Sequence, residues 1–197
     1  MPLTLAALAE EAAGCTRCPL AETRTHVVFG MGDPGADLMF VGEGPGEHED
    51  LQGLPFVGRS GQLLDRLLFE ELGLTRDRCY IANVVKCRPP ANRDPQPLEI
   101  ESCRPYLERQ LELIAPKVVV TLGKFAGQLL LGSNETVTRL RGRSHPYATG
   151  VLVPTVHPAY VLRGGALPMA QMRADLVRAG VELRAAGSPL ADVVGAR

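Results

Sequence analysis

The chain lacks several features that would place it in common protein classes. Its 197 residues contain no tryptophan, and tyrosine and phenylalanine are few. No apolar run reaches the about eighteen residues of a membrane span, and no N-terminal stretch has the basic, apolar and small-residue order of a secretory signal. Five cysteines, an odd number, argue against a closed disulfide framework. These absences predict a reduced, cytoplasmic protein without a membrane partner, in which clustered thiols are more often metal ligands than disulfides.

The chain is almost neutral overall, and the positions of its charged residues are more informative than the net charge. A formal net charge of −1 does not by itself indicate nucleic-acid binding. No aspartate or glutamate occurs from Thr136 to Ala174, and this stretch contains Arg139, Arg141, Arg143, Arg163 and Arg173. A near-neutral chain can carry a positive face for phosphates. A solvated arginine-rich surface explains the same stretch equally well.

Short apolar runs alternate with helical patterns along the chain. Strands are predicted at 36–42, 79–85, 117–123 and 151–156, with Val27 to Phe29 as a further edge strand. Helices are predicted at 60–74, 97–114, 124–132 and 168–186. This alternation indicates an α/β fold, a three-layer α/β/α sandwich around a four-stranded parallel sheet. We expect one domain over 1–197, with an N-terminal metal-binding segment and a loosely held tail at 187–197.

The carboxyl ends of parallel strands form the ligand crevice in such folds. The residues just after the predicted strands should therefore converge; they are the segment from Glu43 to Gly46, the segment from Asn83 to Arg88, Gly123, and His157 with Pro158. Glu43 follows its strand directly and is placed to act on a reacting centre, although a capping or solvated carboxylate is the plainer interpretation. His157 is placed to donate to a developing oxyanion, although a lone histidine is more often structural.

The loop from Gly42 to Gly61 is rich in glycine, which lets the backbone approach a ligand closely. It is neither a Walker A loop nor a Rossmann fingerprint, because no Gly-Lys-Ser/Thr follows and the glycine spacing is wrong. Phe56 within it is either a core side chain or a stacking surface for a planar ligand. Asn83 interrupts an apolar strand, so its amide either bonds nearby backbone or reads the edge of a base.

Four of the cysteines form two pairs. Cys15 and Cys18 make a C-x2-C motif, and Cys87 and Cys103 are separated by fifteen residues. Four soft ligands can hold an iron–sulfur cluster or a zinc ion. The second pair is too widely spaced for a zinc knuckle, which favours a cluster. The fifth, Cys79, is interpreted as a small buried apolar residue.

The motifs together resemble the family 4 uracil-DNA glycosylases, the iron–sulfur branch of the uracil-DNA glycosylase superfamily. The resemblance covers about residues 10 to 185 and rests on GEGPGEHEDLQGLPFVGRSGQLLD, YIANVVKCRPPANRDPQP followed by CRPYL, KVVVTLG, and TVHPAYVLR. It implies an α/β/α sandwich and an enzyme of base excision repair. We expect this enzyme to be monofunctional, because no lysine near the predicted crevice is placed as a Schiff-base nucleophile. Such an enzyme flips uracil out of DNA, hydrolyses its N-glycosidic bond and leaves an abasic site.

The resemblance also implies roles for individual residues. Glu43 would hold or polarise the attacking water, Phe56 would stack on the flipped uracil, and Asn83 would bond its polar edge. His157 would donate to uracil O2 as the base leaves. The first motif supplies Gly42, Gly44 and Gly46, with Gly44 in place of the alanine of the commoner GEAPG form.

For the cofactor, the resemblance implies a structural 4Fe–4S cluster on Cys15, Cys18, Cys87 and Cys103. The expected DNA contacts are Lys86, Arg88, Arg141, Leu162 and Arg163, with Leu162 as a wedge. Expected partners are uracil-containing DNA, double- and single-stranded, and uracil as product. The protein is expected to be a cytoplasmic monomer of bacterial type, associated with the nucleoid when acting.

Three other functions stay open at this point: a non-catalytic uracil sensor, an electron-transfer protein, and a hydrolase of free nucleosides. A related branch traps uracil covalently through a histidine in an arginine-rich insertion. Here Asn83 runs directly into Val84, Val85, Lys86 and Cys87, and no histidine lies between His48 and His145. The sequence therefore argues against the trapping chemistry.

Overall fold

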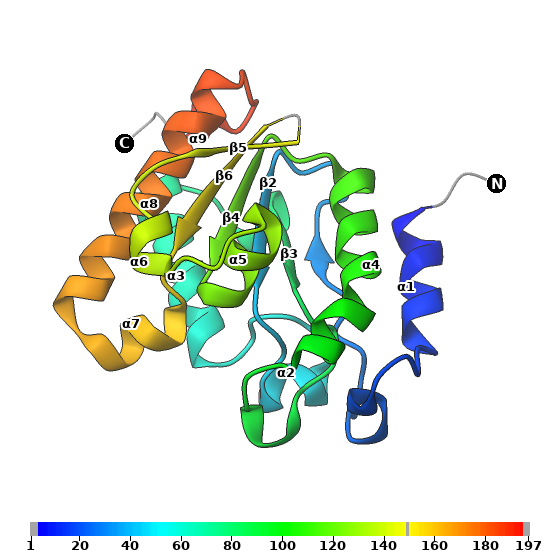
Figure 1. Cartoon of the computed structure of the whole chain (residues 1–197). Coiled ribbons are helices and arrows are strands. Elements are labelled where there is room, and N and C mark those ends of the chain that lie inside the picture. Colours follow the sequence, from blue (N-terminus) through cyan, green and yellow to red (C-terminus); the bar gives the residue numbers. More distant parts are fainter. Residues whose placement is uncertain (1–3, 149, 195–197) are drawn as a thin grey trace.

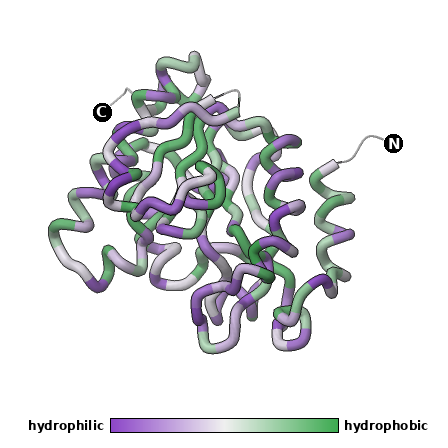
Figure 2. The backbone as a smooth tube through the Cα atoms, in the orientation of Figure 1, coloured by the Kyte–Doolittle hydropathy of each residue, from purple (hydrophilic) through white to green (hydrophobic). Residues whose placement is uncertain are grey.

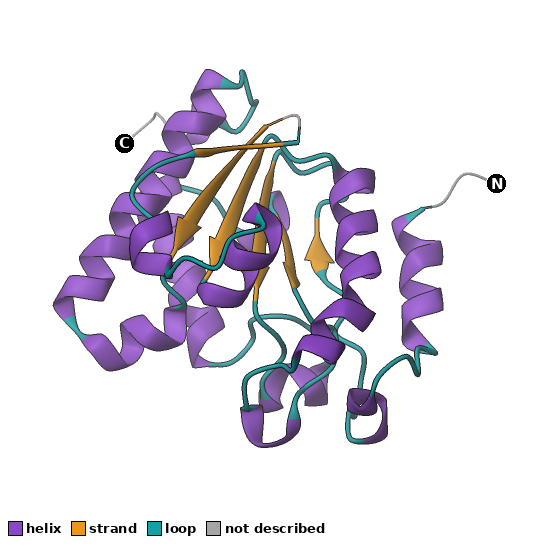
Figure 3. Ribbon diagram, viewed as in Figure 1, coloured by secondary structure: helices purple, strands orange, loops and turns teal. Residues whose placement is uncertain are grey.

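The computed structural model describes residues 4–148 and 150–194, and its centre is a sheet with the strand order β1-β3-β2-β4-β6-β5 (Figure 3). The inner strands are parallel to one another; they are β3 (Tyr80–Asn83), β2 (Leu38–Gly42), β4 (Val118–Leu122) and β6 (Gly150–Thr155). The α/β class and the parallel centre are confirmed. The expected strand count was too low, because antiparallel strands β1 (Met31–Gly32) and β5 (His145–Tyr147) extend the sheet at its two edges.

Neither edge strand has the continuous apolar run by which the inner strands are recognised in the sequence. The edge strand predicted at Val27 to Phe29 is wrong, and the chain pairs with β3 a few residues later, at Met31 and Gly32. Strand β5 is short, only partly buried and contains Pro146. A proline is tolerated at a sheet edge because one side of the strand needs no ladder donors. The positions of these two strands are therefore determined by pairing with β3 and β6 and not by local sequence preference.

Helices cover both faces of the sheet (Figure 1). One face carries α3 (Arg59–Leu72), α7 (Pro158–Gly164), α8 (Ala166–Ala185) and α9 (Ala191–Val194). The other carries α4 (Pro97–Ile114) and α5 (Lys124–Leu131), with α1 (Leu5–Ala13) outside α4. Short α6 (Val137–Leu140) follows α5. The four predicted long helices agree with α3, α4, α5 and α8 to within about two residues at each end, which is the usual uncertainty of helix ends.

The core lies on both sides of the inner strands, whose residues are all buried except at the start of β6. Phe40 and Val120 pack toward α3 and α8, and Met39 and Val119 pack toward α4. A strand with two covered faces reads as a continuous apolar run, which explains why these strands are visible in the sequence. Figure 2 shows the hydrophobic colour concentrated on the sheet and the polar colours on the outer faces.

The ends of the chain differ from expectation in one respect. The segment after Ala186 begins packed and not loosely held, because Leu190 is 6% exposed within the core and the Ser188 hydroxyl donates to the Asp37 carboxylate at 2.7 Å. Residues 195–197 of the predicted tail lie outside the described residues. No helix within the described part of the chain is long and apolar enough to cross a membrane.

Candidate active site

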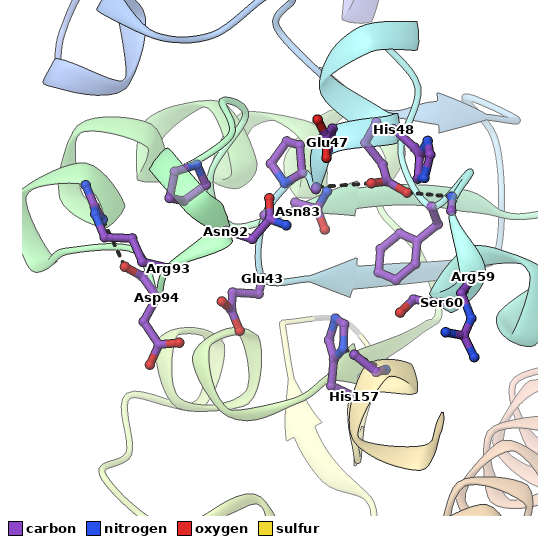
Figure 4. A pocket seen from close by; sticks show the side chains of 18 of the residues that line it. Glu43, Glu47, His48, Arg59, Ser60, Asn83, Asn92, Arg93, Asp94 and His157 are labelled. Atoms are coloured by element: carbon purple, nitrogen blue, oxygen red, sulfur yellow. Dashed lines mark hydrogen bonds between the residues drawn. The ribbon is translucent and has the colours of Figure 1, made fainter. Parts of the chain in front are cut away.

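A pocket of about 590 Å³ opens at the carboxyl ends of the parallel strands. It brings together the residues that follow β2, β3 and β6, with Glu43, Asn83 and His157 among its walls (Figure 4). Its remaining walls come from four segments: the loop that holds α2 (Glu47–Gln52), the start of α3, the loop after β3 that holds the 3-10 turn η3 (Pro90–Asn92), and helix α7. The predicted convergence is confirmed for these three strand ends. Gly123, after β4, lies behind His157, since a Cβ added there would be 3.0 Å from the His157 Cβ.

Glu43 is the carboxylate nearest the end of β2 and is only partly exposed. Burial raises the pKa of Glu43, the negative charge of Asp94 contributes to this rise and the positive charge of Lys124 opposes both, so that the pKa is about 7. Near neutral pH the Glu43 side chain therefore exchanges readily between its acid and its carboxylate. A group with this pKa suits proton transfer to or from water.

His157 is held in one orientation by the start of α7. Its Nδ1 accepts a hydrogen bond from the Ala159 amide at 3.1 Å, as a helix N-cap does. Burial lowers the pKa of His157 to about 4, the positive charge of Arg163 contributes in the same direction, and Glu49 opposes them. The imidazole is therefore neutral at physiological pH. Because Nδ1 is an acceptor, the single ring proton is on Nε2, which makes His157 a neutral hydrogen-bond donor.

Asn83 ends β3 with its side chain almost fully buried, at 1% exposure. Its Oδ1 atom has no hydrogen-bond partner among the described residues. A buried acceptor without a partner is costly and points to a ligand that supplies the donor. Gly42 makes room for this amide, because a Cβ at that position would lie 2.4 Å from Asn83 Oδ1 and 2.5 Å from the ring of Phe56.

Phe56 has an unusual backbone conformation, with a φ of 53°. This left-handed conformation is costly for a bulky residue, and such strain often marks a functional position. Two neighbours hold it: the Arg76 guanidinium donates to the Phe56 carbonyl at 2.6 Å, and Gly61 offers no Cβ to collide with the same carbonyl. The ring is 6% exposed and belongs to the core, yet it also lines the pocket. The interpretation of Phe56 as a core side chain is confirmed, and stacking on a planar ligand stays a prediction that its place in the pocket wall allows.

Glu49 braces the glycine-rich loop. Its carboxylate accepts hydrogen bonds from the amides of Gly46, Val57 and Gly58, at 3.1, 2.9 and 2.8 Å. These bonds tie the start of the loop, next to Glu43, to its end, next to Phe56. The sequence contained a signal for this residue, because a glutamate three positions after a helix N-cap is half of a capping box. Asp94, Arg59 and Ser60 also line the pocket; they lie within the quoted motifs, but the sequence analysis did not single them out as site residues.

The four paired cysteines gather where the N-terminal segment, the chain after β3 and helix α4 meet. Each thiol of Cys18, Cys87 and Cys103 is close enough to others of the set to influence their pKa values. Two donors point at the sulfurs: the Lys86 amide lies 3.2 Å from Cys103 Sγ, and the Arg24 guanidinium lies 3.5 Å from Cys87 Sγ. Donors of this kind are typical around the thiolates of iron–sulfur clusters.

Within the described residues, no three histidine, cysteine, aspartate or glutamate side chains are arranged to hold a single metal ion. In a cluster each thiolate binds a different iron, so its ligands stand further apart than those of one ion. Burial raises the pKa of Cys87 to about 11, so this thiol keeps its proton unless a metal replaces it. The donor set of four free thiols with N–H donors aimed at two sulfurs fits a cluster. Cys79 is separate, fully buried in the core under α3.

The predicted DNA contacts divide into two groups. Leu162 is 41% exposed on α7, Arg163 is exposed and lines the pocket, and Arg88 is partly exposed with its Nε bonded to Asn92 Oδ1 at 2.8 Å. These three are accessible at or near the pocket, and their contact with DNA stays a prediction. The other two, Lys86 and Arg141, are corrected by the structure.

Lys86 is 1% exposed and its ammonium is bonded inside the protein, so it is not available to a phosphate. Arg141 pairs with the buried carboxylate of Asp175 through two hydrogen bonds, at 2.9 and 3.0 Å. Arg173 is likewise paired, with Glu70 and Glu71 of α3. The acid-free stretch is therefore partly neutralised by carboxylates from outside it, which a count along the sequence cannot reveal.

Comparison with known proteins gives the class to which this fold and pocket belong. The sequence model of the Uracil DNA glycosylase superfamily matches residues 29–179. The chain is 46% identical over 167 residues to the type-4 uracil-DNA glycosylase of Sulfurisphaera tokodaii, covering 81% of this chain and 76% of that protein. It is 47% identical over 158 residues to the type-4 uracil-DNA glycosylase of Thermotoga maritima, covering 79% and 82%.

A type-5 uracil-DNA glycosylase of Pyrobaculum aerophilum is more distant, at 37% identity over 147 residues, with 59% of this chain and 65% of that protein covered. The chain therefore belongs to the type-4 uracil-DNA glycosylases of the Uracil DNA glycosylase superfamily. The resemblance noted in the sequence is confirmed, and with it the assignment of the chain as an enzyme of this class.

Proposed function

We propose that the protein is a monofunctional uracil-DNA glycosylase, which releases free uracil from DNA and leaves an abasic site. The observation that carries this proposal is the neutral His157 donor in the same pocket as Glu43 and the unpaired Asn83 Oδ1. Cleavage of an N-glycosidic bond develops positive charge on the sugar and negative charge on the departing base. A carboxylate on one side and a hydrogen-bond donor on the other stabilise both charges where they form.

Uracil has a polar edge that complements the amide of Asn83. Its N3–H group would donate to the unpaired Oδ1, and its O4 would accept from the amide nitrogen. Cytosine presents an unprotonated N3 and an amino group along that edge, so acceptor would face acceptor and donor would face donor. A base must leave the duplex to reach such a pocket, at a cost of about a few kcal/mol. Stacking on Phe56 and the Asn83 bonds would offset that cost, while Gly42, Gly44 and Gly46 let the base approach the backbone.

His157 would donate its Nε2 proton as a hydrogen bond to uracil O2 and stabilise the uracil anion. A neutral donor is suitable because it need not transfer its proton to an anion that is itself a weak base. Glu43, ionised, would orient the attacking water and stabilise the cationic sugar. No lysine lines the pocket in the described part of the chain, so no amine is placed to form a Schiff base. The reaction would therefore stop at the abasic site.

Cys15, Cys18, Cys87 and Cys103 would hold a 4Fe–4S cluster, which supplies a rigid cross-link between distant segments when bound. One of these segments, from Pro89 to Asp94, forms a wall of the pocket. The cysteine site would thereby fix the loop that carries Asp94 next to Glu43. Leu162, Arg163 and Arg88 would contact DNA, in duplexes or single strands, around the pocket opening.

The test is uracil release from an oligonucleotide that contains one deoxyuridine, followed by alkali. We expect many turnovers per enzyme, with strand cleavage only after alkali. Cleavage without alkali would contradict the monofunctional assignment. Stoichiometric binding without release, by protein that holds its iron, would contradict the enzymatic one and indicate a uracil sensor.

A further inference from the structure

Lys86 is a fully buried lysine that sits between the pocket and the cysteine site. Its side chain is 1% exposed, and its ammonium donates to the Asn83 main-chain carbonyl at 2.8 Å and to Gln110 Oε1 at 2.5 Å. It lies 5.9 Å from the centre of the Phe29 ring, within the range of a cation–π contact. Lysine is almost never found so deeply buried without a carboxylate partner.

Burial of this charge is unfavourable unless hydrogen bonds compensate it. Both acceptors of the ammonium are neutral oxygens, and neither belongs to a carboxylate. A methionine or leucine would fill the same space without a desolvation cost. The lysine therefore supplies hydrogen bonds to Asn83 and Gln110 that an apolar side chain could not make.

The contacts of Lys86 join three parts of the chain at one point. Its amide donates to Cys103 Sγ on α4, at 3.2 Å, and its carbonyl accepts from the Val28 amide of the N-terminal segment, at 2.7 Å. Its ammonium then reaches back to Asn83, three residues earlier, at the end of β3. Residues 84 and 85 between them bond the main chain of Gly42 and Glu43. The strand end that carries the Asn83 amide is thus held by these main-chain bonds and, at Asn83 itself, by the Lys86 ammonium.

We propose that Lys86 is a positioning residue for uracil recognition, which fixes the main chain of Asn83 and thereby the direction of its side-chain amide. This inference rests on the proposed function, since it assigns to Lys86 an effect on the Asn83–uracil contact. It replaces the expected phosphate contact of Lys86 with an internal role. Lys86 acts through Asn83 and does not touch the substrate.

A double-mutant cycle between Lys86 and Asn83 distinguishes positioning from general structural support. Lys86→Met keeps the length of the side chain and removes the charge and the donors. Asn83→Ala removes the amide and leaves the carbonyl that Lys86 binds. The two variants and their combination are compared for kcat/KM on a deoxyuridine oligonucleotide and for the affinity of free uracil, measured by calorimetry. Iron content and thermal unfolding are recorded for each protein.

We expect Lys86→Met to lower both kcat/KM and uracil affinity by about tenfold or more, as for other lost hydrogen bonds to charged groups. In the Asn83→Ala background the same change should have little further effect, within about threefold, because the amide that Lys86 positions is already gone. Tyr80→Phe is the matched control. It removes the hydroxyl that contacts Gln110 Nε2 at 3.4 Å in the same buried network, and it does not touch Asn83. Its effects should be small and additive with Asn83→Ala.

Additive losses for Lys86→Met and Asn83→Ala would overturn the proposal, as would unchanged uracil affinity in Lys86→Met. If Lys86→Met does not fold, Gln110→Met removes one of the two tethers of the ammonium, and the same non-additivity is expected at smaller amplitude. Binding of free uracil separates this proposal from the proposed function. A wild-type protein that binds uracil but releases none from DNA would contradict the glycosylase assignment and still allow the cycle to be measured.

Discussion

The imidazole of His157 and the ring of Phe56 lie with their centres 6.0 Å apart and their planes tilted by 35°. Phe56 comes from the glycine-rich loop after β2, and His157 begins α7 after β6. The two rings therefore meet across the end of β4, the strand that lies between β2 and β6 in the sheet. One offers an apolar face and the other a hydrogen-bond donor to the same cavity. Substitutions at single residues can therefore test separately the stacking of the base, the hydrogen bond donated by His157 and the charge of Glu43.

His157→Ala should reduce kcat by about 10²–10³-fold, which is typical for loss of one donor to a developing oxyanion. KM for a deoxyuridine oligonucleotide should change much less, because the donor acts mainly on the departing anion. His157→Gln should recover part of the loss, since an amide N–H can replace Nε2–H. Single-turnover kinetics on each variant measure this. An equal fall in DNA affinity would instead indicate a role in binding.

Titration of His157 should not change the rate of uracil release between pH 5 and 8. Its pKa is lowered to about 4, so the imidazole is already neutral throughout this range. A fall in rate below pH 6.5 that disappears in His157→Gln would contradict the assignment of a neutral donor.

Glu43 should give the pH–rate profile its rising limb. The pKa of Glu43 is raised to about 7, and the ionised form is the one proposed to act, so the rate should increase as the pH rises through that value. Glu43→Gln should lower kcat by orders of magnitude and flatten the profile. The measurement is single-turnover uracil release between pH 5 and 9.

The neighbours of Glu43 provide a matched pair of controls. Asp94→Asn removes a negative charge that raises the pKa of Glu43, so the rising limb should move to lower pH. Lys124→Met removes a positive charge that lowers it, so the limb should move to higher pH. Shifts of the same sign in both variants would show that the limb belongs to another group.

Gly42→Ala should abolish the uracil pocket without unfolding the protein. The added methyl would meet Asn83 Oδ1 and the Phe56 ring at 2.4 and 2.5 Å, so one of these two groups must leave its position. We expect uracil affinity and kcat/KM to fall by at least about tenfold, with iron content unchanged. Gly35→Ala is the control, because a Cβ there meets only Asp33 at 3.6 Å. A fully active Gly42→Ala enzyme would show that the base does not bind against this strand end.

The sequence predicted the parts of this molecule that depend on local pattern. Continuous apolar runs revealed the inner strands, and period-3.6 spacing revealed α3 and α4 almost to the residue. The position after each strand then pointed to Glu43, Asn83 and His157. These inferences succeed because buried parallel strands and amphipathic helices impose their own composition.

Other features depend on contacts between distant residues and were not visible. Arg141 looks like a free cation until α8 places Asp175 beside it, and Lys86 looks like a surface residue until α4 places Gln110 above it. The strained backbone of Phe56 depends on Arg76, which lies outside the glycine-rich loop, and on Gly61 at the end of that loop. For Arg141 and Lys86, a partner far away in the sequence decides whether the charged side chain faces solvent.

Cys87→Ser should release iron and lower stability, whereas Cys79→Ala should do neither to the same degree. Cys87 belongs to the proposed ligand set, and loss of one ligand removes the cross-link between the N-terminal segment and α4. Cys79 is buried in the core under α3, where its replacement only leaves a small cavity. Iron analysis and thermal unfolding of both variants test this. Iron loss from Cys79→Ala with full retention in Cys87→Ser would contradict the ligand assignment.

Substitution of Arg141 should lower stability and leave DNA binding unchanged, whereas substitution of Arg163 should weaken DNA binding and leave stability unchanged. Arg141→Met leaves the Asp175 carboxylate, 1% exposed, without its partner, which should cost about 3–5 kcal/mol of unfolding free energy. Its DNA affinity should be unchanged. Arg163→Met should unfold like the wild type but bind DNA more weakly, with a smaller salt dependence. Adding Asp175→Leu to Arg141→Met should restore much of the stability, because the unpaired buried charge is then gone. If Arg141→Met had wild-type stability and bound DNA more weakly, the result would instead support the original expectation that Arg141 contacts DNA.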